Sequence, residues 1–509
     1  MEEKKRIQRA LISVYHKEGL ENILDALNAL KVELISTGGT HEFITSKGYK
    51  ARKVEDITSY PSILGGRVKT LHPKIFGGLL AKQQEENDKQ EMKMYDFPGV
   101  DLVIVDLYPF EATLQTTSKE EEIIEKIDIG GISLIRAGAK NYNDVLTISS
   151  ASQYEALLNM LNENEGYTTL EERRRFAAEA FAVSSHYDTV IFNHFNKNEN
   201  LSQFRHSEVV NHPLRYGENP HQNSSFYGNL EKVFTQLHGK EISYNNLGDL
   251  DAAINLIQDF GEEPTFAVLK HNNACGIATR PELKEAWNDA IAGDPVSAFG
   301  GILITNTAVD EATAKEINKL FFEIILAPGY DNNALELLKK KKKRIILKKN
   351  NYQFPKKQFR SLLNGVAEQD RDLNVETEEN LQLVSEINPD EKQTEDLIFA
   401  NKVVKHSKSN AIVLVKNKQL LASGIGQTSR VDALKQAIEK AKYFNHNLQE
   451  AVMASDAFFP FADSVEIAKE AGITAIIQPG GSIRDQESID YCNENGLAMV
   501  FTGTRHFKH

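Results

Sequence analysis

The stretch FAVLKHNNACG, residues 266–276, decides how the rest of the chain is interpreted. Its first four residues are apolar and predict a short buried strand, which puts Lys270 and His271 where that strand gives way to a polar loop. Neighbouring strand side chains point to opposite faces, so this pair can share one ligand only at such an end. An ammonium beside an imidazole suits proton transfer at nitrogen with an oxyanion held nearby. A strand end capped by two polar residues is the alternative.

Length and composition set the class of protein. At 509 residues the chain is too long for one core, so we expect about three domain-sized units. No apolar run approaches a membrane span, and the charged start lacks the apolar core of a signal peptide. The two cysteines, Cys275 and Cys492, cannot build a disulfide framework, which favours a cytoplasmic location. The net charge of −13 argues against nonspecific nucleic-acid binding and requires a local cationic pocket for any anionic substrate.

The first third of the chain contains a candidate phosphate site. Residues 10–14 and 32–35 predict strands, and each is followed by a turn and a helix. Lys17 lies in the first turn, and Thr37, Gly38, Gly39 and Thr40 form the second. A glycine turn at a helix N-terminus offers backbone N–H groups and a positive dipole end to an anion. A tight turn that merely needs glycine is an equally good explanation of this motif alone, but Lys17 at the same sheet edge favours phosphate.

Two further cations follow in LGGRVKTLHP, residues 64–73. In an extended segment Arg67 and Lys69 would face one way, with Thr70 next to them. A surface basic pair is the alternative. A polar run that begins with glycine more often lines a site, so we place this pair beside the phosphate turn.

The same edge of the predicted sheet receives proton-carrying groups. The apolar strand at 102–105 delivers Tyr108 to its carboxyl end, the usual ligand edge of an open parallel sheet. Asp128, Gly130 and Gly131 lead into a predicted helix that carries Lys140, and residues 145–148 predict another strand. The alternation of strands and helices predicts an α/β unit with right-handed crossovers.

The middle of the chain divides the predicted domains. Residues 169–195 predict a long amphipathic helix whose run Arg173-Arg174-Arg175 is expected on a solvated face. Residues 196–207 predict a linker. We therefore expect domains at 1–195, 196–365 and 366–509. The basic run at 339–344 is expected to be a solvated helix end.

Further candidate binding residues lie on both sides of a second α/β unit that begins at 411–415. A loop-forming cluster places Arg215 where it could clamp a phosphate bidentately. The stretch 455–463 gathers three phenylalanines between two aspartates; this is usually core, yet it also suits a slot for a flat heterocycle. The basic end at 504–509 could reach back to an anion or fray.

Eight motifs occur in order along nearly the whole chain and resemble the bifunctional AICAR formyltransferase/IMP cyclohydrolase family of purine biosynthesis. They are GGRVKTLHP (65–73), LYPF (107–110), IDIGG (127–131), RAGAKN (136–141), LRYGENPHQ (214–222), KHNNACG (270–276), SDAFFPFAD (455–463) and RHFKH (505–509). One departure from the family pattern is Asp106, where asparagine is commoner before LYPF. We assign it no role from the sequence.

The resemblance implies a fold and a chemistry. The implied fold is α/β: a methylglyoxal-synthase-like parallel-sheet domain, followed by a duplicated cytidine-deaminase-like transformylase region. The implied co-substrate is 10-formyltetrahydrofolate, with no redox cofactor, no catalytic metal and a structural monovalent cation. A zinc deaminase would need His-x-Glu and Pro-Cys-x-x-Cys, whereas His271 is followed by two asparagines and Cys275 stands alone. The implied assembly is a homodimer that binds nucleotide and folate and neither nucleic acid nor membrane.

The resemblance also implies residue roles. His271 would take the proton of the attacking amine, and Lys270 would stabilise the oxyanion or protonate the departing folate nitrogen. The implied ring-closure groups are Lys69, Lys140, Tyr108 and Asp128. The implied substrate-binding residues are Lys17, Thr37, Gly38, Gly39, Thr40, Arg67, Thr70, Gly130, Gly131, Arg215, Tyr216, Gly300, Asn410, Arg430, Phe458, Pro460, Phe461, Asp463 and Arg505.

Three other functions remain to be weighed. Residues 1–150 could be a non-catalytic module that binds a phosphate effector, fused to a separate transferase, although phosphate binding alone needs neither Tyr108 nor Asp128. A phosphate-eliminating synthase would share the phosphate turn and lack the motifs at 214–505. Nucleic-acid binding rests only on residues 339–344 and is disfavoured by the net charge.

Overall fold

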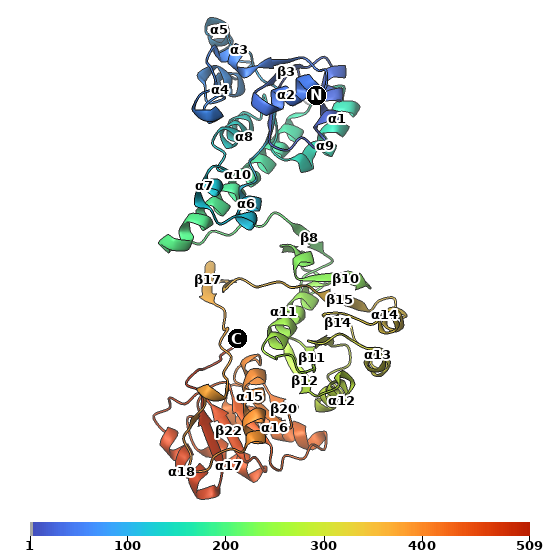
Figure 1. Ribbon diagram of the computed structural model, residues 1–509, viewed down its shortest axis with the longest axis vertical. Coiled ribbons are helices and arrows are strands. Elements are labelled where there is room, and N and C mark those ends of the chain that lie inside the picture. Colours follow the sequence, from blue (N-terminus) through green and yellow to red (C-terminus); the bar gives the residue numbers. More distant parts are fainter. Residues whose placement is uncertain (1–3) are drawn as a thin grey trace. The chain divides into compact units, whose positions relative to one another are not determined.

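The computed structural model describes residues 4–509, which form two compact units (Figure 1). The first unit ends at Val209, and the second runs from Val210 to His509. Each unit has its own sheet and its own buried core.

The first unit is built on a five-stranded sheet with the order β4-β3-β2-β5-β6, and every neighbouring pair is parallel, as predicted. Its strands are β2 (Arg9–Val14), β3 (Glu33–Ser36), β4 (Ala51–Lys53), β5 (Leu102–Asp106) and β6 (Leu146–Ile148). A separate antiparallel pair joins β1 (Lys5–Arg6) to β7 (Tyr167–Thr168).

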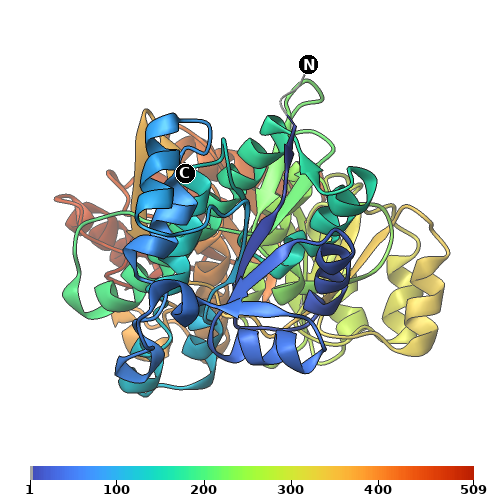
Figure 2. The same ribbon diagram turned by 90° about the horizontal axis from the view of Figure 1, so that it is seen from above.

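Helices cover both faces of this sheet (Figure 2). One face packs against α1 (Leu20–Ala29) and α9 (Tyr154–Glu163). The other packs against α4 (Pro73–Leu80), α8 (Gly130–Lys140) and α10 (Leu170–Glu199). Because both faces are covered, the strands are apolar and polar side chains gather at their ends. The remaining helical elements are α2 (Gly38–Ser46), α3 (Val54–Thr58), η1 (Leu64–Gly66), α5 (Glu86–Met94), α6 (Phe110–Thr116), α7 (Glu120–Ile124) and η2 (Ala151–Gln153).

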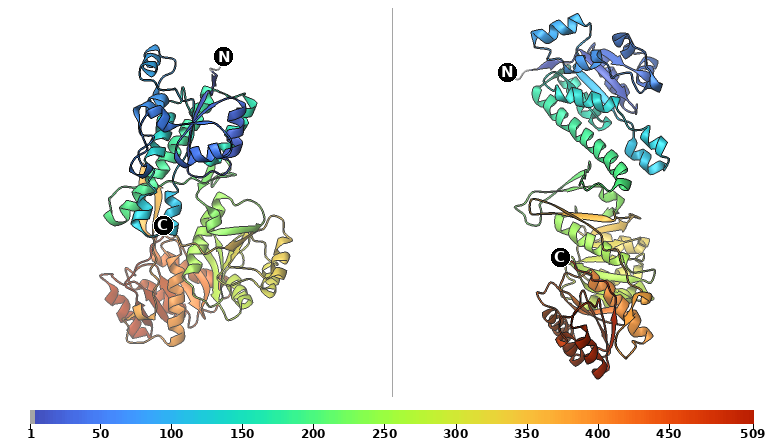
Figure 3. Two further views of the ribbon diagram at one scale, coloured as in Figure 1. Left: turned by 45° about the horizontal axis from the view of Figure 1, so that its top comes forward. Right: turned by 90° about the vertical axis from the view of Figure 1, so that its left-hand side faces the viewer.

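Helix α10 is one long helix that begins at a capping box (Figure 3). The Thr169 hydroxyl accepts from the Glu172 N–H, and the Glu172 carboxylate accepts from the Thr169 N–H. Arg174 and Arg175 are exposed as expected, but the prediction is wrong for Arg173, which is 2 % exposed. Its guanidinium donates to the carbonyls of residues 142 and 168, so its buried charge is satisfied at the start of the helix.

The second unit is built on a twelve-stranded sheet in which one arrangement occurs twice. In each copy, an antiparallel hairpin is followed by three parallel strands. The first copy contains β11 (Thr265–Lys270), β12 (Asn273–Thr279), β13 (Ile302–Thr305), β14 (Ile324–Ala327) and β15 (Ile345–Lys349). The second contains β19 (Ile412–Lys416), β20 (Gln419–Gly424), β21 (Val452–Ser455), β22 (Ala475–Gln478) and β23 (Ala498–Phe501). The sheet therefore contains the expected duplication.

Edge strands and helices complete the second unit. The outermost strands of the sheet are β10 (Phe234–His238) and β18 (Gln382–Leu383). Each hairpin has one helix before it and one after it: α11 (Tyr244–Gln258) and α12 (Leu283–Gly293) in the first copy, α15 (Glu391–Lys405) and α16 (Arg430–Tyr443) in the second. The other helical elements are η3 (Leu230–Lys232), α13 (Glu311–Ile317), α14 (Asn332–Lys339), η4 (Glu378–Asn380), α17 (Asp463–Glu470) and α18 (Asp485–Asn495).

The two copies are joined along the sheet and across its helices. Strand β12 pairs with β20, and α11 and α15 share one buried apolar cluster. At the end of α11, the Asp259 carboxylate accepts from Lys405 Nζ at 2.8 Å and lies 2.7 Å from His406 Nε2. Burial alone would raise the pKa of Asp259, but these two partners lower it. The copies are thus fixed to one another by both packing and charge.

The basic run at 339–344 is only partly a solvated helix end. Residues 340–343 are exposed, as expected. Arg344 is 5 % exposed, so the prediction is wrong there. Its guanidinium lies 4.1 Å from the centre of the Phe322 ring and donates to Asn318 Oδ1 at 3.0 Å. The last cation of the run is therefore part of the packing.

Two hairpins form small sheets of their own in the second unit. They are β8 (Asn211–Leu214) with β9 (Ser224–Tyr227), and β16 (Lys357–Leu362) with β17 (Gly365–Asp370). Every residue of β17 is exposed, and Figure 1 shows this hairpin apart from α11 and α15. Phe359, Leu362 and Val366 are each more than two-fifths exposed on it.

Within residues 4–509, no helix is both long enough and apolar enough to cross a membrane.

The C-terminal segment is anchored and does not fray. The Ser409 N–H donates to the Lys508 carbonyl at 2.9 Å, and the Lys508 N–H donates to Ser409 Oγ at 3.0 Å. His506 is 2 % exposed and lies 2.6 Å from Asp372 and 3.0 Å from Glu376. Burial alone would lower the pKa of His506, but its hydrogen bonds to these carboxylates raise that pKa to about 9.

This raised pKa makes stability depend on pH. The contribution of His506 is fully present below pH 6.5, its ordinary value, and is lost as the pH rises towards about 9. We therefore expect the free energy of unfolding to fall over this window, and to fall less in His506→Gln. Urea titrations at one protein concentration measure it, with the exposed Glu379→Gln as control. An equal fall in His506→Gln and wild type would contradict the assignment.

Candidate active sites

In the first unit, the predicted phosphate turn and two lysines meet at the carboxyl ends of β2 and β3. Helix α2 begins at Gly38, and the Thr37 side chain makes no capping hydrogen bond to it. The first N–H groups of such a helix lack intrahelical partners. A side-chain carbon on Gly38 would lie 2.9 Å from Lys69 Nζ, so glycine here leaves room for an ammonium. The corner therefore combines N–H donors, a helix dipole and a cation, which suits an anion.

Lys17 belongs to the same corner. Its ammonium donates to the carbonyls of Val14 and Tyr15 at the end of β2. Thr40 Oγ1 accepts from the Val14 N–H at 3.1 Å and ties α2 to that strand end. Burial lowers the pKa of Lys17, and the positive charge of Lys69 lowers it further, while the charge of Asp106 acts in the opposite sense. Two ammonium groups held this close favour a bound anion.

Asp128 lies at the start of α8 and is linked to Tyr108. Its carboxylate accepts from the Gly131 N–H at 2.6 Å and from the Tyr108 N–H. Burial raises the pKa of Asp128 despite these bonds and the nearby charge of Lys69. Burial also raises the pKa of Tyr108, and the charge of Asp128 adds to it. A carboxyl and a phenol with raised pKa beside a lysine can donate and accept protons.

Gly130 and Gly131 at the start of α8 allow neighbouring side chains to come close to the helix backbone. A side-chain carbon on Gly131 would lie 2.5 Å from Asp128 Oδ2, and one on Gly130 would lie 3.1 Å from Thr70 Oγ1. Thr70 thus comes to the N-terminus of α8, as the sequence placed it near the site.

Arg67 and Lys140 do not lie where the sequence analysis expected them. Arg67 adopts a helical conformation after η1, so the expected extended segment is wrong. Its exposed guanidinium lies 3.4 Å from Glu125. Lys140 is the last residue of α8, and Asp128 precedes its first residue. The helix rise alone separates them by about 15 Å, so within this unit the structure does not bring Lys140 to the Asp128 group.

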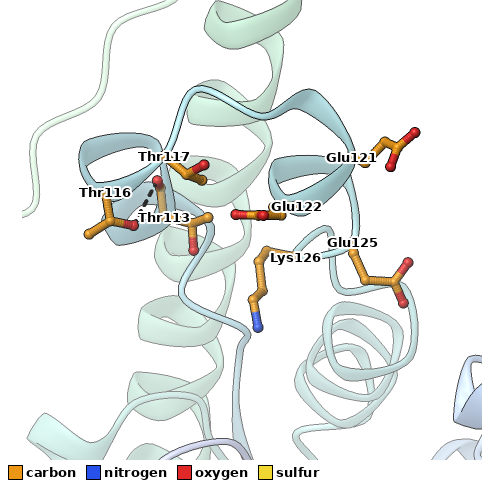
Figure 4. A pocket seen from close by; sticks show the side chains of 7 residues that line it. All are labelled: Thr113, Thr116, Thr117, Glu121, Glu122, Glu125 and Lys126. Atoms are coloured by element: carbon orange, nitrogen blue, oxygen red, sulfur yellow. Dashed lines mark hydrogen bonds between the residues drawn. The ribbon is translucent and has the colours of Figure 1, made fainter.

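A cavity of about 640 Å³ lies next to this site. It is lined by Thr113, Thr116, Thr117, Glu121, Glu122, Glu125 and Lys126 (Figure 4). Figure 4 shows Glu121 and Glu125 pointing away from the threonines. The Lys126 ammonium lies over the rings of Tyr15 and Tyr108, 5.2 and 5.9 Å from their centres. Lys126 therefore links the cavity wall to the aromatic side of the site.

In the second unit, Lys270 and His271 lie at a tight turn where the sequence predicted a loop. Lys270 ends β11 and pairs with Asn273, which begins β12, so only His271 and Asn272 form the connection. Both have left-handed backbones, with φ of 49° and 65°. This is the twist of the two-residue hairpin turns that normally use Asn-Gly, and it carries strain for other residues.

Two side chains and one backbone group hold this turn. The Asp249 carboxylate, on α11, accepts from the Asn272 N–H at 2.6 Å. The Asn273 amide donates to the His271 carbonyl at 2.8 Å and accepts from the Lys408 N–H at 2.9 Å. Burial raises the pKa of Asp249, and the hydrogen bond from Asn272 opposes the rise. These contacts keep His271 at the end of the hairpin.

Lys270 is oriented by the segment before β13. Its ammonium donates to the Phe299 carbonyl at 2.8 Å, and the next residue, Gly300, has a left-handed backbone. An ammonium has three N–H donors, so two remain for a ligand. The structure thus brings the predicted Gly300 and Lys270 together.

Two of the nucleotide-binding candidates, Arg430 and Arg505, lie at the ring of Phe507. The guanidinium groups of Arg430 and Arg505 lie 5.7 and 4.3 Å from the centre of its ring. Arg430 is the first residue of α16 and lies 3.4 Å from the buried Asp456 carboxylate. Burial lowers the pKa of Arg430, and the charge of Arg505 lowers it further. Asn410 donates from its amide to the Gln427 carbonyl at 3.0 Å, which fixes the loop before α16.

The phenylalanine stretch at 455–463 has one ring in the core and one at the surface. Phe459 is fully buried, whereas Phe461 is about half exposed and lies under the Arg484 guanidinium. Phe458 and Pro460 flank the buried ring, and Asp463 is the first residue of α17. An exposed ring with a cation on one face suits a flat heterocycle on the other.

Arg215 and Tyr216 follow β8, in a sheet separate from that of Lys270. The guanidinium lies 5.5 Å from the tyrosine ring. This places both residues on the small hairpin of the second unit.

Sequence reasoning missed the residues that hold the site. Asp249 lies inside a helix, and Asn273 looked like part of a loop; neither pattern carries a signal of its own. An aspartate in the interior of a helix that otherwise buries apolar residues was the one available hint.

The chain was compared with known proteins. Residues 19–133 match the family described as "MGS-like domain", and residues 138–440 match "AICARFT/IMPCHase bienzyme". A protein of Bacteroides thetaiotaomicron named "Bifunctional purine biosynthesis protein PurH" is 64 % identical over 509 residues, covering 100 % of both chains. Relatives of the same name from Aquifex aeolicus and Acetivibrio thermocellus are 46 % and 44 % identical, covering 98 % and 99 % of this chain and 100 % of their own.

The contribution of the Asp249 hydrogen bond to the 271–272 turn can be measured as a free energy of unfolding. Asp249→Ala leaves the Asn272 N–H without its carboxylate, and we expect the free energy of unfolding to fall by about 1–3 kcal/mol. Asp249→Asn keeps an acceptor oxygen and should lose less. Urea titration gives the values, and Glu262→Ala, an exposed site after α11, is the control. Equal stabilities for Asp249→Ala and wild type would show that the carboxylate does not hold the turn.

Proposed function

This chain belongs to the AICARFT/IMPCHase bienzyme family, and we propose that each of its two units carries one of that family's two activities. It is a bifunctional enzyme of purine biosynthesis, with AICAR formyltransferase and IMP cyclohydrolase activity. We assign ring closure to residues 1–195, which lie in the first unit, and formyl transfer to two subdomains, 196–365 and 366–509, which from Val210 onward form the second unit. The observation that carries the assignment is the Lys270-His271 corner, which offers an ammonium and an imidazole at one strained turn.

Formyl transfer needs help at the attacking nitrogen. The amine of AICAR is conjugated with the ring and its carboxamide, so it is a poor nucleophile and depends on a positioned base. His271 takes the amine proton as the nitrogen bonds to the formyl carbon. Lys270 stabilises the tetrahedral oxyanion or protonates the folate nitrogen as its bond to that carbon breaks. The hydrogen bond from Lys270 to Phe299 orients the ammonium for this task.

The nucleotide and the folate occupy opposite sides of this corner in our proposal. Cations and amides hold the ribonucleotide, and the exposed phenylalanine stretch faces the folate. The nucleotide side consists of Arg215, Tyr216, Gly300, Asn410, Arg430 and Arg505, and the folate side of Phe458, Pro460, Phe461 and Asp463.

Ring closure joins the carboxamide nitrogen to the formyl carbon and then eliminates water. The step needs a proton acceptor at that nitrogen and a donor at the formyl oxygen. Asp128 and Tyr108 have raised pKa values and lie beside Lys69, which supports their roles as these carriers. The phosphate binds to the α2 corner through Lys17, residues 37–40, Arg67 and Thr70, with Gly130 and Gly131 giving access.

Lys140 stays a proposed catalytic residue of ring closure. Lys140 lies at the far end of α8 from Asp128 of the same chain. In this role it would therefore act together with the Asp128 group of a second copy of the protein. The alternative of a non-catalytic effector module would leave the paired pKa shifts of Tyr108 and Asp128 without a use.

The formyl donor is a formyl-folate, which we propose to be 10-formyltetrahydrofolate, with no redox cofactor and no catalytic metal. A structural monovalent cation fits near Asp456. Its carboxylate is buried, and its Oδ2 has no hydrogen-bond partner among residues 4–509. Such an oxygen is a suitable ligand for a hard cation.

We also propose a homodimer in the cytoplasm. The β16–β17 hairpin exposes apolar side chains on both strands and forms its own small sheet, so a second copy is a suitable partner for it. Nucleotide and folate are the proposed small-molecule partners, with neither nucleic acid nor membrane.

His271→Ala tests the formyl-transfer site. We expect the rate of formyl transfer to fall at least about a hundredfold because the base is lost, while ring closure of supplied FAICAR is unchanged. Folate product and IMP are followed separately by absorbance. Near-normal formyl transfer in a folded variant would remove His271 from the mechanism.

Lys69→Ala tests the ring-closure site and should give the opposite pattern of lost and kept activity. We expect IMP formation from FAICAR to be abolished and formyl transfer to be kept, since the substituted ammonium lies only in the first corner. Lys53→Ala, at an exposed position of β4, is the matched control. Loss of both activities in a folded Lys69→Ala protein would speak against separate sites.

A further inference from the structure

Asp106, which the sequence left without a role, ends β5 and contacts the loop after β2. The two strands are parallel neighbours, with Val14 opposite Asp106. The Asp106 carbonyl accepts from the Tyr15 N–H at 3.3 Å. Its carboxylate accepts from the His16 N–H at 2.8 Å and lies 2.6 Å from His16 Nδ1. One residue thus makes three contacts with the two residues that precede Lys17.

The His16–Asp106 contact has a defined chemistry. A carboxylate can only accept, so His16 Nδ1 carries the proton that joins them. The Asp106 side chain is 17 % exposed and the His16 side chain 49 %. Fully exposed ion pairs contribute little to stability, but this carboxylate is mostly covered and also binds a backbone N–H. The pair therefore fixes both the ring and the backbone of the loop.

The pair lies among the proposed ring-closure groups. Asp106 is two residues before Tyr108, and the Tyr15 ring packs edge-on against Tyr108 at 5.5 Å and against His16 at 4.9 Å. The charge of Asp106 raises the pKa of Lys17 against the effect of burial, and it adds to the raised pKa of Asp128. Asp106 is thus within electrostatic reach of two groups in the site.

We propose that His16 and Asp106 form a positioning pair for ring closure. The pair holds the loop after β2 against the end of β5, so that Lys17 and Tyr108 face the same nucleotide. This inference rests on the proposed role of the first unit. Strand β5 is buried in the sheet, whereas the loop is not, so loss of the pair displaces Lys17 and leaves Tyr108 in place. The pair should therefore act on the binding of the ribonucleotide phosphate more than on the chemical step.

Ring-closure kinetics with FAICAR test this on the full-length enzyme. We expect His16→Ala and Asp106→Ala each to raise KM by about tenfold, the effect of one charge-assisted hydrogen bond, with kcat within about twofold. The amide of His16→Asn can donate from the position of Nδ1, and Asp106→Asn keeps an acceptor, so both should recover most of the loss. Formyl transfer should not change in any of them.

A double-mutant cycle with Lys17 separates positioning from mere stability. Lys17→Ala should itself raise KM, and adding Asp106→Ala should raise it little further, because the pair acts through Lys17. Glu33→Ala is the matched control: it removes the Arg9–Glu33 pair that joins the start of β2 to β3, and it should leave KM unchanged. Thermal melting confirms that the variants are folded.

Three results would overturn the inference: an unchanged KM in both alanine variants, a fall in kcat alone, or additive effects of Lys17 and Asp106. If Lys17→Ala leaves KM unchanged, the proposed phosphate site fails, and the pair has no partner to position. If Lys17→Ala raises KM and Asp106→Ala does not, the site stands and only the pair is wrong.

Discussion

The two-residue turn at 271–272 is the constraint on which the second unit depends. His271 and Asn272 both have left-handed backbones, a conformation that is uncommon for residues other than glycine, although Asn and His adopt it more often than most. The conformation persists because Asp249 and the Lys408 backbone hold it from outside the hairpin, and Asn273 holds it from the first position of β12. Strain of this kind is often found at functional sites, where the surrounding structure fixes a reactive group in one position. Here the fixed group is an imidazole beside an ammonium.

The two units place polar groups at the ends of buried strands in different ways. In both, the strands are buried on their two faces, so chemistry can occur only where strands end. The first unit places a helix N-terminus and three polar strand ends around one corner. The second duplicates a hairpin and joins the copies through β12 and β20, which brings the Lys408 loop of one copy to the turn of the other.

The sequence predicted the strands and most candidate residues, because apolar runs and glycine turns have local signatures. It placed Lys17, Lys69 and Tyr108 at one sheet edge correctly. It did not predict the tight turn after Lys270, since His-Asn is not a usual turn pair. It also could not show that Arg173 and Arg344 are buried or that Asp106 meets His16, because those contacts join residues far apart in the chain or depend on packing. Contacts between residues far apart in the chain leave no periodic pattern in the sequence.

The central claim is that one chain offers two separate nucleotide corners. The most direct measurement is a crystal structure of the full-length protein with AICAR bound. The account predicts the nucleotide with its amine within hydrogen-bond reach of the His271 imidazole and its phosphate among the arginines near Phe507. A nucleotide bound elsewhere, with the 270–271 turn closed to ligand, would contradict it.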